Sequence, residues 1–165
     1  MLTVTHSRKM RRGIAAVAGL VAAVGVASPA AAVNDTDNLY SPEACKRPGI
    51  SKFKFHIHFN SGQNGSYRNI GYSIYDFDDA PDGVVGVTTP LRFCEVNGAS
   101  APWPGSGLKV KNNAASGENE HYKYWARVYF NSGYKGAQDV MAPYQHVDTF
   151  RNVHNNNASF KWTSK

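Results

Sequence analysis

The sequence predicts an all-β fold, a sandwich built from two similar units, and three observations support this prediction. Phe59-Asn60-Ser61-Gly62 returns unchanged as Phe130-Asn131-Ser132-Gly133, at an offset of 71 (130 − 59). Apolar and polar residues alternate before each copy of this tetrapeptide, as they do in half-buried strands. From Val33 onwards, no apolar pattern of helical period is sustained. The repeat indicates an internal duplication.

The repeat continues beyond the tetrapeptide. Gly65 corresponds to Gly136 at the same offset, and the segment Asn112-Asn113-Ala114-Ala115-Ser116 has its counterpart in Asn155-Asn156-Asn157-Ala158-Ser159. We call these two segments the NNxAS loops. The glycines can adopt positive φ, so each opening strand is expected to turn back in a tight hairpin.

The second copy carries a recognisable pattern. Residues 129–136 fit aromatic-x4-aromatic-x-Gly, which resembles the Greek-key signature of βγ-crystallin-like domains, and 155–159 is similar to the start of that family's calcium motif. The first copy departs from this pattern at His58 and Gln63, where the family has aromatic residues. The resemblance covers most of 53–162 and implies a β-sandwich of two Greek-key motifs.

The resemblance divides a single domain, residues 53–163, into copy one at 53–121 and copy two at 122–163. Alternating aromatic and β-branched residues predict strands in copy one, at 53–59, 66–76 and 91–96.

Copy one is longer than copy two. The offset from Phe59 to Asn112 is 53, whereas the offset from Phe130 to Asn155 is 25, a difference of 28 (53 − 25). Most of the excess falls in 78–107, which is rich in Pro and Gly. Such an insertion is expected to be a loop, either a decoration or the binding element.

Residues 1–32 are typical of a secretory signal peptide. Arg8-Lys9-Met10-Arg11-Arg12 precedes an uncharged apolar run at 13–27, and Ala30-Ala31-Ala32 supplies the cleavage site. The apolar run is too short to span a bilayer. The sequence therefore predicts a secreted, extracellular protein that has no membrane association once the signal is removed.

The predicted mature chain, residues 33–165, has the size of one domain. Four basic residues and no acidic one leave with the signal, so 14 Lys and Arg (18 − 4) face 12 Asp and Glu, a net charge of +2. A nucleic-acid partner is not expected, because neutralising phosphates requires a clustered basic face. We expect a monomer.

Residues 33–52 show no periodicity and are predicted to be an irregular leader that Cys45 fixes to the domain. Cys45 and Cys94 are the two cysteines of the chain, and an even number in an exported protein favours a disulfide. Closing this loop would stabilise the fold by about 4 kcal/mol. Two buried thiols are the alternative. Two cysteines are too few for a zinc site of the C-x2-C type.

The crystallin resemblance also implies weak calcium binding. The ligands would be Asn113 and Ser116 in one site and Asn156 and Ser159 in the other, with neutral amides in place of carboxylates. Millimolar affinity or none is expected from such ligands. Alternatively, these side chains close the Greek-key turns by hydrogen bonds to the backbone.

Two other groups of residues invite a chemical interpretation. His56 and His58 share one face of a strand, opposite the apolar residues, towards solvent or the polar side of the sheet. They could share a metal ion, but no third ligand is visible, so we expect a solvated histidine pair.

Hydrolysis is the second chemical interpretation, and it would need paired carboxylates or a His/Glu pair. Two clusters qualify by composition, Glu118, Glu120 and His121, and Asp76, Asp78 and Asp79. No hydrolase motif accompanies them, so we expect no enzymatic activity.

Trp103 is flanked by Pro102 and Pro104 within the insertion. Proline on both sides restrains the backbone, and a large aromatic residue on a stiff loop suits an anchor for a partner's pocket. The alternative is that Trp103 covers a small core of the insertion itself. Both interpretations remain open at this point.

The resemblance implies a function as well as a fold. Exported crystallin-like domains of bacteria include a branch of peptidase inhibitors typified by a secreted metalloproteinase inhibitor, although the paired cysteines of that branch are absent here. We therefore predict a non-enzymatic inhibitor of a secreted protease. The alternatives are a weak calcium-binding structural module and an antifungal or cell-wall binding protein.

Overall fold

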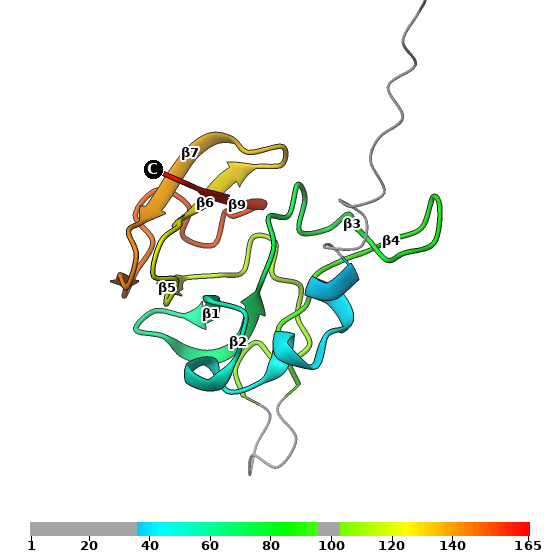
Figure 1. Cartoon of the computed structure of the whole chain (residues 1–165), viewed down its shortest axis with the longest axis horizontal. Helices are drawn as coiled ribbons and strands as arrows, with labels where there is room; N and C mark the ends of the chain where they lie inside the picture. The colour runs from blue at the N-terminus through cyan, green and yellow to red at the C-terminus, as the bar shows by residue number, and fades with distance from the viewer. Residues whose placement is uncertain (1–35, 96–102) are drawn as a thin grey trace, which may run out of the picture.

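The computed structural model describes residues 36–95 and 103–165 (Figure 1). The predicted signal peptide and Pro102 lie outside these residues. In the described part of the chain, no helix has the length and apolar character needed to cross a membrane.

The fold is all-β and every strand pair is antiparallel. One sheet has the order β2-β1-β5-β8, another has the order β7-β6-β9, and β3 and β4 form a separate hairpin. The strands are β1 (Phe55–Asn60), β2 (Asn64–Ile70), β3 (Ala80–Pro81), β4 (Thr88–Thr89), β5 (Ser116–Asn119), β6 (Trp125–Asn131), β7 (Lys135–Met141), β8 (His146–Val147) and β9 (Ser159–Thr163).

The two copies of FNSG occupy equivalent places in two similar hairpins. The register of β1 with β2 shifts between His58 and Asn60, and that of β6 with β7 shifts between Tyr129 and Asn131. Phe59 and Phe130 are therefore the equivalent residues at each shift. The turns that follow match as well, since Gly62 and Gly133 have φ of 70° and 74°, a conformation that favours glycine.

A segment of each copy pairs with a strand of the other copy. β8 of copy two pairs with β5 of copy one through Gly117 and Val147. In the opposite direction, Ile74 of copy one forms an isolated bridge with Phe160 in β9. This crossing makes each unit a Greek key and interlocks the two units, and the predicted fold class is confirmed.

The NNxAS loops meet where the copies cross. The Asn112 N–H donates to the Asn157 carbonyl at 2.8 Å, and the Asn155 N–H donates to the Ala114 carbonyl at 2.9 Å. Asn112 and Asn155 both have positive φ, 60° and 54°, a region that asparagine tolerates better than most residues. The pairing is thus reciprocal, as expected around an approximate twofold axis.

The core lies between the two larger sheets and draws on both copies. Phe55 of copy one stacks on Phe160 of copy two with ring centroids 4.3 Å apart. Burying such side chains removes apolar surface from water, which is the main force that stabilises the fold. The largest fully buried apolar residues are Phe55, Phe77, Phe93, Phe150, Phe160, Ile57, Ile70, Ile74, Leu91 and Met141.

Two of the strand predictions need correction. β2 ends at Ile70 rather than continuing to residue 76, because the chain then crosses to the other sheet. The strand predicted at 91–96 is wrong, since only Arg92 forms a bridge among the described residues there. Leu91 and Phe93 are instead buried in the core. The insertion therefore contributes to the core as well as to the surface.

The leader is more regular than the sequence suggests. Residues 36–40 are helical, and two 3-10 turns follow, η1 (Pro42–Cys45) and η2 (Pro48–Ile50). Cys45 and Cys94 form the predicted disulfide, with Cα atoms 5.5 Å apart.

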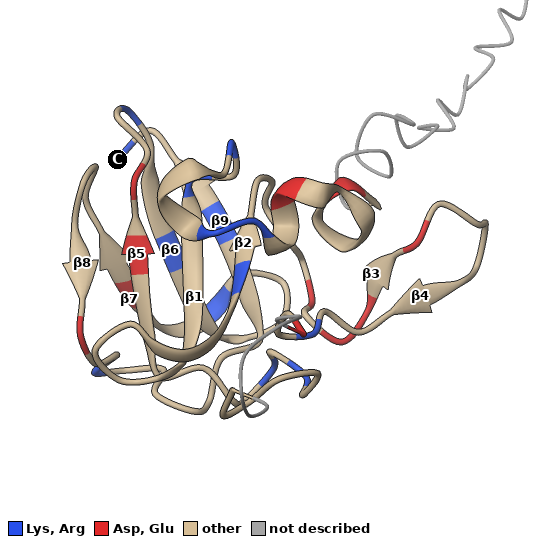
Figure 2. Ribbon diagram, turned by 90° about the horizontal axis from the view of Figure 1, so that it is seen from below, with Lys and Arg blue, Asp and Glu red and all other residues tan. Residues whose placement is uncertain are grey.

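The leader lies over the outer face of β1 and β2 (Figure 2). Arg68 donates to the carbonyls of Asn38 and Leu39, and the Asn69 amide donates to those of Glu43 and Lys46. This part of the sheet is consequently covered on both faces.

The prediction that His56 and His58 face solvent is wrong. His56 is fully buried and His58 is 5% exposed. The alternation that suggested a solvated face is real, but residues of the leader and the insertion pack against that face. Arg47, Pro48 and Trp103 lie around His58.

Candidate functional site

The serines of the NNxAS loops close the two hairpins. Ser116 Oγ donates to the Asn60 carbonyl at 2.6 Å and accepts from the Gln63 N–H at 3.1 Å. Ser159 Oγ does the same with Asn131, at 2.7 Å, and with the Tyr134 N–H, at 3.1 Å. Both serines are fully buried. These bonds fulfil the structural role that was one of the two alternatives for these residues.

The asparagines of the predicted calcium sites bond to backbone carbonyls that precede their loops in the sequence. The Asn113 amide donates to the carbonyls of Lys109 and Lys111, and the Asn156 amide donates to that of His154. The described residues hold no group of three or more His, Cys, Asp or Glu side chains placed to bind a metal ion. Calcium binding by these loops stays a prediction.

The insertion projects from the sandwich as the β3–β4 hairpin (Figures 1 and 2). Val84, Val85 and Val87 lie at its end and are 62%, 102% and 45% exposed. We call these three residues the valine tip. Exposed apolar side chains gathered at one place usually mark an interaction surface.

The valine tip stands on a turn with defined hydrogen bonds. The Val84 N–H donates to Asp82 Oδ1 at 2.9 Å, and the Val87 N–H donates to the Val84 carbonyl at 3.0 Å. The base of the hairpin is fixed to the core, because Ala80 and Leu91 are fully buried. The tip is therefore an apolar end on an anchored support.

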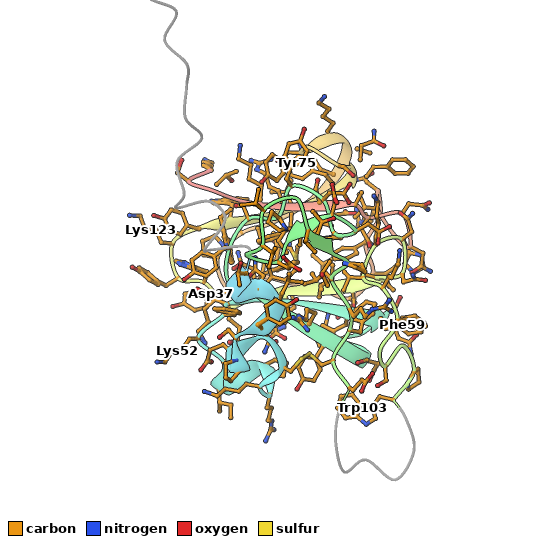
Figure 3. All side chains as sticks on the ribbon, turned by 90° about the vertical axis from the view of Figure 1, so that its right-hand side faces the viewer. Asp37, Lys52, Phe59, Tyr75, Trp103 and Lys123 are labelled. Carbon is orange, nitrogen blue, oxygen red and sulfur yellow. A yellow bond between two sulfur atoms is a disulfide. The ribbon has the colours of Figure 1, made fainter. Side chains whose placement is uncertain are left out.

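Trp103 packs against β2 rather than against a core formed by the insertion alone, and its role as an anchor for a partner stays a prediction. Its side chain is 40% exposed and contacts Tyr67 edge-on, with ring centroids 6.1 Å apart. Trp103 lies at the opposite end of the molecule from Tyr75 (Figure 3). The Pro104 carbonyl accepts a hydrogen bond from the Ser66 N–H at 2.8 Å, which holds this loop against β2.

Trp103 forms one wall of a pocket of about 390 Å³. We call it the His58 pocket, and its lining residues are Arg47, Pro48, His58, Gln63, Gly65, Tyr67 and Trp103. Neither ring nitrogen of His58 has a hydrogen-bond partner among the described residues. Burial lowers the pKa of His58 to about 4, and the nearby charges of His56 and His146 act in the same direction.

A larger concavity than the His58 pocket, an open groove of about 1030 Å³, lies on another side of the molecule. Asp37 and Lys52, which belong to its lining, lie apart from Trp103 in Figure 3. The lining combines aromatic, acidic and basic side chains. They include Phe53, Tyr72, Tyr122, Tyr144, Trp162, Asp37, Glu43, Glu118, Glu120, Lys52, Lys54, His121 and His146.

One of the two acidic clusters noted in the sequence belongs to this groove. Glu118 Oε1 lies 3.2 Å from His146 Nδ1, and Glu120 Oε2 lies 3.1 Å from Lys54 Nζ and 3.3 Å from His56 Nε2. Both carboxylates therefore already have partners.

The other acidic cluster has a structural role. Asp76 lies 2.8 Å from Lys111 Nζ and accepts a hydrogen bond from Ser132 at 2.7 Å. Burial opposes the ionisation of Asp76, but these partners outweigh it and lower its pKa. The bond to Ser132 joins copy one to copy two.

Comparison with known proteins gives a similarity in fold only. No protein-family model matches the chain, and no curated protein gives a significant match. A solved domain from work on the evolution of the eye-lens βγ-crystallin fold aligns with a TM-score of 0.46 and 12% identity, over 69% of this chain and 88% of that one.

Two further solved structures are similar. The N-terminal domain of protein S has a TM-score of 0.42 and 14% identity, over 67% of this chain and 96% of that one. A βγ-crystallin domain from Flavobacterium johnsoniae has a TM-score of 0.40 and 12% identity, over 67% and 94%. The Greek-key description of this chain rests on its own strand order and crossings.

The buried His58 makes stability depend on pH. Its pKa is about 4 in the folded chain and has an ordinary value of 6.5, so between these values the unfolded chain binds a proton that the folded chain does not. We expect the contribution of this residue to the free energy of unfolding to be complete above pH 6.5. It should fall towards pH 4, by up to about 3 kcal/mol.

Urea unfolding at pH 7, 5.5 and 4.5 measures this effect. The His58→Leu variant should lose less stability between pH 7 and 4.5 than the wild type, whereas His154→Asn, at an exposed position, should match the wild type. An unchanged pH dependence in His58→Leu would show that His58 is not the responsible group.

Proposed function

We propose that this protein is a secreted peptidase inhibitor whose valine tip enters the substrate cleft of the target enzyme. The observation that carries the proposal is the projecting β3–β4 hairpin with three exposed valines at its end. A convex apolar element suits a concave cleft, and anchors that fill a partner's pocket contribute most of the binding energy at interfaces.

The construction of the hairpin supports this role. Binding costs free energy when flexible groups become ordered, and a restrained element reduces this cost. Gly83 and Gly86 adopt positive φ, 95° and 79°, and the side chain of Asp82 holds the turn. Valine has a stiff side chain, so it loses little rotamer freedom when it is buried.

An extracellular location is part of the same proposal. It is supported by the signal-peptide pattern of residues 1–32 and by the Cys45–Cys94 disulfide. Disulfides persist in oxidising compartments, which include the extracellular space. The partner would then be a secreted peptidase, and a lack of enzymatic activity in this protein stays a prediction.

The test is inhibition of a panel of secreted metallo-, serine and cysteine peptidases by residues 33–165. For an inhibited enzyme, Val85→Asp should weaken inhibition by at least about thirtyfold, the loss expected when an anchor residue is removed. Its thermal stability should not change, because the Val85 side chain is fully exposed.

Ile50→Asp is the matched control, since Ile50 is also apolar and 70% exposed but lies in η2. It should inhibit as the wild type does. The proposal is wrong if no peptidase is inhibited at micromolar concentration, or if the two substitutions weaken inhibition equally.

A second function, binding to a cell-wall polysaccharide, is favoured by the aromatic lining of the groove. Tyr122 and Tyr144 are 72% and 68% exposed beside the carboxylates of Glu118 and Glu120. Aromatic rings offer flat apolar faces on which sugar rings can stack, and carboxylates accept hydrogen bonds from hydroxyl groups.

Co-sedimentation with insoluble chitin, cellulose and peptidoglycan tests this second function. Tyr122→Ala combined with Tyr144→Ala should reduce the bound fraction several-fold, because two exposed stacking surfaces are lost. Tyr75→Ala, at a similarly exposed tyrosine outside the groove, is the control. Equal binding by the wild type and both variants, or no binding to any polysaccharide, would show that the groove is not a polysaccharide-binding site.

A further inference from the structure

We propose that the His58 pocket binds a small aromatic ligand that carries a hydroxyl group at one end and an anionic group at the other. This site is separate from the valine tip and from the groove, and the proposal does not depend on inhibition. Three features of the lining determine the chemistry of the ligand.

The first feature is the buried imidazole of His58, which is one of the residues that line the pocket. His58 is 5% exposed, and neither of its ring nitrogens has a hydrogen-bond partner among the described residues. Buried polar groups are nearly always paired, because leaving one unpaired costs free energy. A neutral imidazole has one donor and one acceptor, and a hydroxyl group can bond with either.

The second feature is the pair of aromatic walls. Tyr67 and Trp103 approach each other at an interplanar angle of 63°, and Pro48 adds further apolar surface. Aromatic side chains favour stacked and edge-on contacts with other rings. The volume of about 390 Å³ lies within the range of small-molecule sites. A site of this kind also accounts for a large aromatic residue that stays 40% exposed.

The third feature is a free cation. The Arg47 side chain is exposed, and the structure gives it no hydrogen bond or ion pair with any described residue. Arg68, by contrast, is buried and bonded to the leader. A guanidinium group pairs well with a carboxylate, often through two parallel hydrogen bonds. The anionic end of the ligand would therefore lie at Arg47.

The probes are 4-hydroxybenzoate, which carries both groups, benzoate and phenol, which carry one each, and cyclohexanecarboxylate, which has no aromatic ring. Each is titrated into residues 33–165 and followed by ¹H–¹⁵N NMR. We expect 4-hydroxybenzoate to bind about tenfold more tightly than benzoate or phenol, with shifts at His58, Tyr67 and the Trp103 indole. Cyclohexanecarboxylate should bind most weakly.

Variants of His58 and Arg47 test which residue binds each end of the ligand. His58→Leu should weaken 4-hydroxybenzoate about tenfold and leave benzoate unchanged, and His58→Gln, which keeps a hydrogen-bonding side chain, should restore part of the loss. Arg47→Gln should weaken both acids and leave phenol unchanged. Tyr75→Ala, at an exposed tyrosine outside both the pocket and the groove, is the control.

The proposal is overturned if no probe gives saturable shifts at these residues up to about 10 mM, a limit near the weakest affinity of a specific site. It is also overturned if 4-hydroxybenzoate binds no better than benzoate, a comparison that needs only the wild-type protein. Equal affinity of wild type and His58→Leu for 4-hydroxybenzoate would likewise exclude His58 as the group that binds the hydroxyl.

Discussion

The two hydrogen bonds that pair the NNxAS loops connect the two copies at the point where their chains cross. Asn112 and Asn155 donate to Asn157 and Ala114, and each bond is the counterpart of the other. On either side of this pairing, β8 and Ile74 cross into the opposite sheet. Neither copy completes a sheet or a core without the other, so the interlocked pair is expected to unfold as one unit.

The two similar hairpins of the copies were predictable because the sequence features that specify them are local. Repeated glycines and asparagines mark the turns that need positive φ, and alternating residues mark β1 and β6. The disulfide was predictable from the even number of cysteines and from the predicted signal peptide. The burial of His56 and His58 was not, because alternation does not show that the leader and the insertion pack against that face of the strand. Nor does alternation show that Leu91 and Phe93 enter the core without forming a strand.

The candidate sites were only partly predictable, for the same reason. Glu118, Glu120 and His121 are neighbours in sequence, but the aromatic residues beside them come from Tyr72, Tyr144 and other separate segments. Polar residues of the two duplicated units form hydrogen bonds within the fold and are not free to bind a partner. The buried hydroxyls of the NNxAS loops are examples. The surfaces that we propose for partners fall instead on the leader and the insertion. The valine tip belongs to the insertion, and the His58 pocket and the groove both include residues of the leader.

Native-state hydrogen exchange tests most directly whether the pairing of the NNxAS loops holds the fold together. Asn112 and Asn155 are exposed residues, yet their amides should exchange only through global unfolding, with the same free energy and urea dependence as the core amide of Phe160. The Val87 amide, in the projecting hairpin, should exchange through local opening at a lower free energy. Exchange of Asn112 or Asn155 as rapid as that of Val87 would contradict this account.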